Sequence, residues 1–331
     1  MQNKNFWSKL PKPFFALAPM ADVTDCAFRA LIAKYGKPDV LWTEFVSADG
    51  LCLAPKTGRE KLLKNLEYTK AEKPIVAQIF GSKPEYIEKA SRLVVDLGFD
   101  GVDINMGCPD KAIERQCAGA AMMKDPKLAK EIIRAAKRGA ASGKNNISVS
   151  VKTRVGFNKV ELEKWIPAIL EEDIDVLTVH ARTRKEMSKV PANWDHIKRT
   201  VEIRNEMGKT TLIIGNGDVK SVEEGILRVK ETGCDGIMIG RGIFGNPWLF
   251  SKKKKEITTK EKLKVLIEHT KLFEKKLTGF KNFSVMKKHF KAYVNEFPGS
   301  KELREKLMET ENSSEVEVII GDFLKTIDIK K

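Results

Sequence analysis

Cysteine is scarce in this 331-residue sequence, and no two cysteines form a C-x-x-C pair. The five that occur are scattered along the chain: Cys26, Cys52, Cys108, Cys117 and Cys234. Disulfide frameworks use even numbers of cysteines and zinc sites use closely spaced ones, so both are disfavoured here. We therefore predict that the protein has no metal site and resides in a reducing, cytoplasmic compartment.

Long apolar segments are also missing. No apolar run approaches the roughly 18 residues that a membrane span needs, so we expect no membrane association. Lysines precede a short apolar stretch at residues 14–18, which faintly resembles a signal peptide. Because Pro11, Pro13 and Pro19 interrupt this region, we interpret it as the start of a first buried strand.

The charge is unbalanced. Lysine and arginine number 60 against 45 aspartates and glutamates, a net charge of +15, which indicates a polyanionic partner. The excess is local, because residues 252–291 hold 14 Lys and 4 Glu, whereas residues 292–331 hold 6 basic and 9 acidic residues. A solvated lysine-rich helix face is the alternative, but the local concentration favours a surface that contacts a phosphate backbone.

One pattern repeats from about residue 14 to residue 250. A short apolar run is followed by a loop rich in Gly, Asn or Asp and then by a longer amphipathic stretch. Near-continuous apolar runs are typical of strands buried on both faces of a parallel sheet. Eight such runs occur, at residues 15–18, 40–45, 75–80, 101–104, 147–152, 176–180, 211–214 and 236–239.

Eight strands alternating with helices over about 240 residues match the size of a TIM barrel, an α/β fold of the (β/α)8 type. A doubly wound open sheet is the alternative, and it is disfavoured because the first strand-loop lacks a glycine-rich dinucleotide fingerprint. Helix starts are marked between the strands. Ser82 and Ser221 each precede a glutamate by three residues, as in a capping box, and Asp125 precedes a proline.

The strand pattern stops near residue 251. Thr258 and Glu261 form a capping-box pattern before a helix with an apolar stripe, and Pro298 separates the helices that follow. Those later helices are predicted near residues 284–295, 301–309 and 315–326. We therefore predict two domains, a catalytic barrel over residues 1–250 and a small basic helical domain over residues 251–331.

In a TIM barrel, chemistry takes place at the C-terminal ends of the strands. Polar, reactive or glycine-rich segments lie at that end of seven of the predicted strands. The residues in question are Pro19, Met20, Ala21, Gln78, Asn105, Cys108, Lys152, His180, Arg182, Asn216, Gly217, Asp218, Gly240 and Arg241.

The glycine-containing turns after the seventh and eighth predicted strands predict a phosphate site. Glycines allow backbone N–H groups to approach a phosphate, and Arg241 adds a charge-assisted donor. Tight turns alone would explain either glycine segment, but both segments together with an arginine favour phosphate. On the other side of the barrel opening, Lys152 needs an anionic partner because it is desolvated at a strand end. With Gln78 and His180 nearby, this set suits a phosphorylated heteroaromatic cofactor, although His180 alone could be a satisfied core histidine.

Cys108 lies in a Gly-Cys-Pro turn that projects its thiol into the predicted pocket. A buried small hydrophobe is the usual fate of a free cysteine, and we assign that role to Cys26, Cys52 and Cys234. No His–Asn pattern indicates a protease nucleophile. Since a free thiol has a pKa of about 8.5, Cys108 would be protonated at neutral pH and able to act as a general acid. Cys117 receives no role.

These motifs resemble those of the tRNA-dihydrouridine synthases, flavin enzymes that reduce uridine in tRNA. The most specific one is Asp103-Ile104-Asn105-Met106-Gly107-Cys108-Pro109, and residues 18–21, 151–154, 180–184 and 240–248 match as well, so the resemblance covers nearly the whole chain. It implies an FMN-binding barrel, NADPH as reductant, and a helical domain that holds tRNA while one uridine is reduced to 5,6-dihydrouridine. No obligate protein partner is evident.

The resemblance also implies a role for each matching residue. Cys108 corresponds to the proton donor, Asn105 is expected near the flavin and the uracil, and Arg182 is expected to bind substrate. The flavin ring would be contacted by Pro19, Met20, Ala21, Gln78, Lys152 and His180. The phosphate end of the cofactor would be held by Asn216, Gly217, Asp218, Gly240 and Arg241.

One loop departs from the family pattern. Residues 185–195 lack the usual Tyr and Gly and read Lys-Glu-Met-Ser-Lys-Val-Pro-Ala-Asn-Trp-Asp.

Two other functions are compatible with the barrel. A flavin barrel such as a dihydroorotate dehydrogenase would act on a free small molecule, and the basic tail argues against it. An RNA-binding protein without catalysis is disfavoured by the intact Cys108, Lys152 and phosphate turns.

Overall fold

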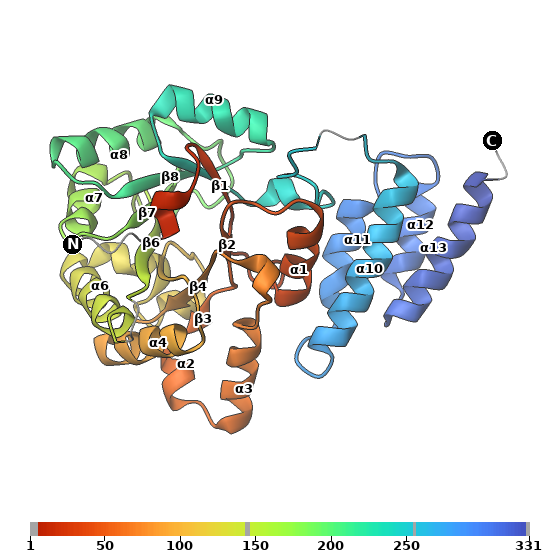
Figure 1. Ribbon diagram of the computed structural model, residues 1–331, viewed down its shortest axis with the longest axis horizontal. Helices are drawn as coiled ribbons and strands as arrows, with labels where there is room; N and C mark the ends of the chain where they lie inside the picture. Colours follow the sequence, from red (N-terminus) through yellow and green to blue (C-terminus); the bar gives the residue numbers. More distant parts are fainter. Residues whose placement is uncertain (1–5, 143–145, 254–255, 329–331) are drawn as a thin grey trace.

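A parallel sheet closes on itself at the left of the molecule, and a group of helices lies beside it (Figure 1). The structure is a computed structural model that describes residues 6–142, 146–253 and 256–328. The strands are β1 (Phe14–Leu17), β2 (Leu41–Trp42), β3 (Val46–Ser47), β4 (Ile75–Phe80), β5 (Gly101–Met106), β6 (Ser148–Arg154), β7 (Val176–His180), β8 (Leu212–Asn216) and β9 (Gly236–Ile239).

The strand order confirms the predicted TIM barrel. Neighbouring strands pair in parallel in the order β1-β9-β8-β7-β6-β5-β4-β2. A parallel bridge between Ala16 and Val40 joins the two ends, so the sheet closes. Strands β1, β4 and β5 are buried along their whole length, as their near-continuous apolar runs require.

The second predicted strand is interrupted. Residues 40–45 were expected to form one strand, but within that range only β2 forms, and the chain rejoins the sheet in β3, just beyond it. At the break, the Thr43 hydroxyl accepts the Gln78 N–H at 3.1 Å, in the place of a backbone carbonyl. The side chain therefore replaces one bond of the ladder, which a hydrophobicity pattern does not reveal.

Helices surround the barrel between the strands (Figure 1). They are α1 (Cys26–Tyr35), α2 (Ala48–Leu53), α3 (Lys56–Asn65), α4 (Pro84–Asp96), α5 (Lys111–Glu114), α6 (Pro126–Ala140), α7 (Leu162–Leu170), α8 (Asp195–Glu206) and α9 (Val222–Thr232). Short 3-10 helices are η1 (Phe6–Lys9), η2 (Lys70–Glu72), η3 (Gly119–Lys124) and η4 (Arg241–Ile243).

The predicted helix starts are partly confirmed. Asp125 accepts the Leu128 N–H and caps α6, as expected. Ser221 caps α9, but Glu224 accepts the Lys220 N–H instead of completing a capping box. The prediction for Ser82 is wrong, because its hydroxyl donates to the Gln116 carbonyl and leaves α4 without a side-chain cap.

The barrel interior is apolar at its N-terminal end and polar at its C-terminal end. Trp7 of η1 packs against Phe14 and Trp42, with ring centroids 5.6 and 5.9 Å away, and these rings fill the N-terminal end of the barrel. Closer to the C-terminal ends of the strands, Gln78 and Asp103 are buried inside the barrel. Buried polar groups require partners, so this end is where a site can be built.

The C-terminal helices pack against α1 (Figure 1). They are α10 (Thr259–Leu277), α11 (Lys287–Tyr293), α12 (Ser300–Met308) and α13 (Ser313–Asp328), with η5 (Phe283–Met286) before α11. The capping box at Thr258 and Glu261 is confirmed. The domain boundary at residues 250–251 falls between η4 and α10 and stays a prediction. None of the described helices is long and apolar enough to cross a bilayer.

Candidate active site

A cavity of about 950 Å³ opens at the C-terminal ends of the barrel strands. Strand geometry explains its lining, because alternate side chains of each strand point into the barrel. The structure brings thirteen of the fourteen predicted residues into this lining: Pro19, Met20, Gln78, Asn105, Cys108, Lys152, His180, Arg182, Asn216, Gly217, Asp218, Gly240 and Arg241. Ala21 is exposed in the turn after β1 and lies outside the lining.

A buried polar network forms the floor. The Asp103 carboxylate accepts hydrogen bonds from Gln78 Nε2 at 2.6 Å and from Ser150 Oγ at 2.5 Å. Burial raises the pKa of this carboxyl to about 6, although the bonds from Gln78 and Ser150 oppose that rise. Gln78 Oε1 accepts in turn from Asn105 Nδ2 at 2.9 Å.

The turn that carries Cys108 is held at both ends. Asn105 Oδ1 accepts the N–H groups of Gly107 at 3.1 Å and Cys108 at 2.8 Å. The Cys108 carbonyl accepts the Ala120 N–H at 2.9 Å. An added Cβ at Gly119, whose φ is +59°, would lie only 2.8 Å from that carbonyl oxygen, so the close approach requires glycine. Burial raises the pKa of the Cys108 thiol, which therefore stays protonated at neutral pH.

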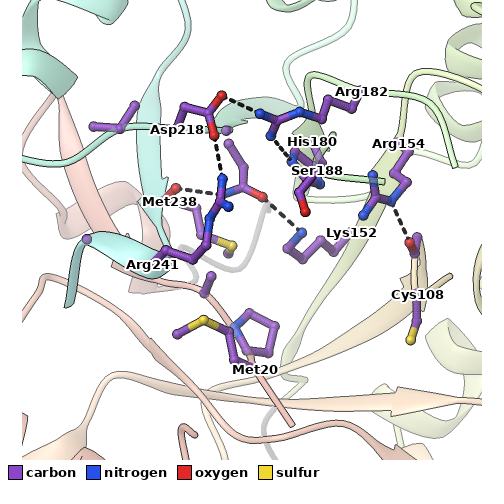
Figure 2. A pocket seen from close by; sticks show the side chains of 18 of the residues that line it. Met20, Cys108, Lys152, Arg154, His180, Arg182, Ser188, Asp218, Met238 and Arg241 are labelled. Carbon is purple, nitrogen blue, oxygen red and sulfur yellow. Dashed lines mark hydrogen bonds and ion pairs between the residues drawn. The ribbon is translucent and has the colours of Figure 1, made fainter. Parts of the chain in front are cut away.

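Lys152 crosses the middle of the cavity (Figure 2). Its Nζ donates to Asn216 Oδ1 at 3.2 Å, and Asn216 Nδ2 donates to the Met238 carbonyl at 2.8 Å. Burial, with the nearby Arg154 guanidinium, lowers the pKa of Lys152 to about 8, while Asp103 opposes that change. The ammonium group is still largely protonated at neutral pH and favours an anionic or electron-rich ligand.

The two glycine-rich turns meet at Asp218. Its carboxylate forms ion pairs with Arg182 and with Arg241, the latter at 2.6 Å, so it lies between them (Figure 2). A carboxylate cannot donate to a phosphate, so its side chain positions Arg241 instead. Within the described parts of the chain, the backbone N–H groups of Gly217, Asp218, Gly240 and Arg241 have no hydrogen-bond acceptor. Those donors and the guanidinium suit a phosphate.

His180 is neutral in this setting. Burial lowers its pKa well below the usual value, and the cationic Arg154, Lys152 and Arg182 side chains add to the effect. Its Nε2 lies 3.1 Å from Arg182 Nη1, and since guanidinium only donates, Nε2 accepts and the proton resides on Nδ1. His180 therefore presents a fixed tautomer beside the cavity.

Several lining residues were missed at the level of sequence. Arg154 Nε donates to the Gly107 carbonyl at 2.8 Å, and its Nη1 donates to the carbonyls of Thr183 and Met187 at 3.2 and 3.0 Å. It therefore ties the Cys108 turn to the loop after β7. Its position two residues after Lys152 on the same strand face was a usable signal. The other missed polar residues are Ser188, Lys220 and Glu296.

The cysteines differ in exposure. Cys26 and Cys234 are buried, as predicted, but Cys52 is half-buried at the rim of a second groove, so the prediction for it is wrong. Cys117 is exposed. All five described cysteines are free, and no cluster of metal-ligating side chains occurs in the described residues.

Known proteins match both the sequence and the fold. A family model described as dihydrouridine synthase matches residues 16–328. "Probable tRNA-dihydrouridine synthase 2" of Bacillus subtilis is 41% identical over 322 residues, which is 97% of each chain. "Probable tRNA-dihydrouridine synthase" of Staphylococcus aureus (strain COL) is 39% identical over 327 residues, 98% of this chain and 97% of that one.

Solved structures add a likeness in fold alone. Histamine dehydrogenase from Rhizobium sp. 4-9 has a TM-score of 0.52 at 11% identity and covers 78% of this chain and 48% of its own. The 6-hydroxypseudooxynicotine amine oxidase of Pseudomonas geniculata N1 has a TM-score of 0.52 at 13% identity, over 72% of this chain and 46% of its own.

Proposed function

The chain belongs to the dihydrouridine synthase family, and on that premise we propose that it reduces a specific uridine of tRNA to 5,6-dihydrouridine, with FMN as cofactor and NADPH as reductant. The observation that supports this most is the placement of three groups in one cavity. The Cys108 thiol, the Lys152 ammonium and the two glycine-rich turns all line it.

The residues present fit FMN. The backbone N–H groups of Gly217, Asp218, Gly240 and Arg241, with the Arg241 guanidinium, would hold its phosphate. On the ring side, Gln78 and Lys152 offer donors, and Met20 offers apolar contact. When bound and reduced by NADPH, FMN would supply the hydride that uridine reduction requires at carbon 6 of the uracil.

Cys108 is the proposed proton donor to carbon 5 of the uracil. Its thiol lines the cavity and stays protonated at neutral pH because burial raises its pKa. In Figure 2 it lies on the side of the cavity opposite Asp218 and Arg241. A positioned general acid typically contributes about 100–10,000-fold to a rate.

The uracil must leave the RNA stack to enter this cavity, at a cost of a few kcal/mol. Arg182 is our candidate for contacting the substrate, although its guanidinium is engaged by Asp218 and by the Val190 carbonyl. Ser188, in the loop that departs from the family pattern, lies in the lining and adds a hydroxyl there.

A lysine-lined groove next to the active-site cavity supports an RNA path. It holds about 680 Å³ between the barrel and helices α10–α13, which we call the helical unit, and it shares Lys220 and Glu296 with the active-site cavity. Lys34, Lys253 and Lys262 also line it. Cationic side chains that lead to a site are expected where a phosphate backbone is held.

An assay of purified protein tests the proposal. We expect flavin absorbance after incubation with FMN, and dihydrouridine in tRNA incubated with the holoenzyme and NADPH. Parallel reactions with NADH and with free uracil or uridine define the reductant and exclude a small-molecule pyrimidine reductase. Protein that binds no FMN, or that reduces free pyrimidines but not tRNA, would contradict the proposal.

A further inference from the structure

Asp103 lies beneath the cavity and is not part of its lining. Its side chain is fully buried, and both carboxylate oxygens accept a hydrogen bond: one from Gln78 Nε2, the other from Ser150 Oγ. No step of the proposed reaction uses this carboxylate. A buried ionisable group is costly, so its presence calls for a role.

The carboxylate determines how the Gln78 amide is oriented. A primary amide donates at one end and accepts at the other, whereas a carboxylate only accepts. Gln78 Nε2 therefore faces Asp103, and Gln78 Oε1 faces Asn105 Nδ2. Turning the amide by 180° would oppose two acceptors at Asp103 and two donors at Asn105.

The constraint continues to the Cys108 turn. Asn105 Nδ2 donates to Gln78, and its Oδ1 accepts the backbone N–H groups of Gly107 and Cys108, so both ends of the Asn105 amide are engaged. A continuous series of hydrogen bonds thus runs from Asp103 through two amides to the residue that carries the thiol. Each amide can satisfy its neighbours in only one orientation.

We propose that Asp103 is a positioning residue, which sets the hydrogen-bonding face that Gln78 presents to the cavity and, through Asn105, holds the Cys108 turn. The inference rests on the proposed function for its catalytic meaning. The orientation itself depends only on the hydrogen bonds of the described residues.

The test compares two substitutions of similar shape. D103L removes the acceptor, so Gln78 loses its partner. D103N retains an acceptor oxygen for Gln78 and can donate to Ser150 Oγ, since a hydroxyl also accepts. We expect D103L to weaken FMN binding about tenfold, the worth of one hydrogen bond, and D103N to stay within about threefold of wild type. If D103L does not fold, D103A removes the acceptor instead.

A double-mutant cycle separates positioning from a structural effect. If Asp103 acts through Gln78, D103L will change FMN affinity in wild type but add little in a Q78M background. Equal losses in both backgrounds, or a D103N variant as impaired as D103L, would overturn the inference. Wild-type protein that fails to bind FMN would instead count against the proposed function.

A second readout needs no flavin. Iodoacetamide alkylation of Cys108 in flavin-free protein, followed by peptide mass spectrometry to separate it from the exposed Cys117, reports on the turn. We expect D103L to speed alkylation of Cys108 by about fivefold or more and D103N to leave it unchanged. Equal rates in all three proteins, with unchanged thermal midpoints, would show that Asp103 does not hold the turn.

Discussion

Lys281 Nζ lies 2.8 Å from Glu44 Oε1, and this ion pair joins the helical unit to the mouth of the barrel. Glu44 is 3% exposed, and it also accepts the Asp22 N–H at 2.6 Å. Asp22 belongs to the turn after β1, which carries Pro19 and Met20 into the cavity. The lysine therefore connects the packing of the C-terminal helices to an active-site turn.

Removing this lysine should destabilise the fold. K281M leaves the Glu44 carboxylate buried without its cation, and we expect a loss of about 3 kcal/mol in the free energy of unfolding. Urea unfolding followed by circular dichroism measures it. The double variant K281M/E44Q should recover part of the loss, because it no longer buries an unpaired charge. Additive losses would show that the pair is not coupled.

Cys108 should be required for turnover but not for cofactor binding. We expect C108A to retain FMN and to form dihydrouridine about 100–10,000-fold more slowly, because the positioned acid is lost. C117A is the matched control, since Cys117 is exposed and outside the cavity lining, and it should keep wild-type rates. Near-normal turnover of C108A would reject the role assigned to that thiol.

Arg241 should act on the phosphate and not on the ring. Hydrogen bonds to charged groups contribute about 1.5–3 kcal/mol, so R241Q should weaken FMN binding about 10–100-fold. Riboflavin lacks the phosphate, and its affinity should not change. Fluorescence titration measures both ligands, with R92Q on the outside of α4 as control. An equal loss of affinity for riboflavin would show that Arg241 does not act through the phosphate.

Two buried histidines should make the fold sensitive to acid. His269 of α10 and His289 of α11 pack with ring centroids 4.6 Å apart, and both rings lie against Phe28 of α1. Burial lowers the pKa of His269 to about 3 and that of His289 well below its usual value. Both are neutral when folded, whereas the unfolded chain binds their protons below a pH of about 6.5.

The contribution of these two neutral histidines to the free energy of unfolding should therefore be fully present above about pH 6.5. It should be lost progressively as the pH falls below that value. Each histidine contributes a slope of about 1.4 kcal/mol per pH unit in that range. We expect H269F to show a shallower loss than wild type between pH 6.5 and 5, measured by urea unfolding. H196Q, outside this cluster, serves as the control. An unchanged slope in H269F would contradict the assignment.

Binding of tRNA should weaken steeply with salt. Exposed lysines such as Lys264, Lys288 and Lys291 lie on or next to α10 and α11. Replacing one that contacts a phosphate should lower affinity and reduce the slope of log affinity against log salt by about one. K127Q, on α6 at the far side of the barrel in Figure 1, should leave both unchanged. Filter binding of tRNA across a salt series measures both the affinity and its slope.

Much of the site was predictable because a barrel gathers what its strands carry at one end. Gln78, Asn105 and Lys152 lie at the C-terminal ends of apolar runs, and parallel closure brings those ends together. The alternation of side chains along a strand also places Arg154 on the face that Lys152 occupies. Ala21 was included because residues 18–21 match the family motif, but the turn there exposes it.

The sequence by itself determined the class of fold, most of the side chains that meet in the cavity and the local basic charge, because these follow from hydrophobic periodicity, the direction of the strands and composition. Tertiary structure alone decided which groups became partners. It placed Asp218 between two arginines, brought Glu296 to the cavity and paired Lys281 with Glu44. Such contacts join segments far apart in the chain, and their geometry is set by the packing of whole elements, which no local pattern encodes.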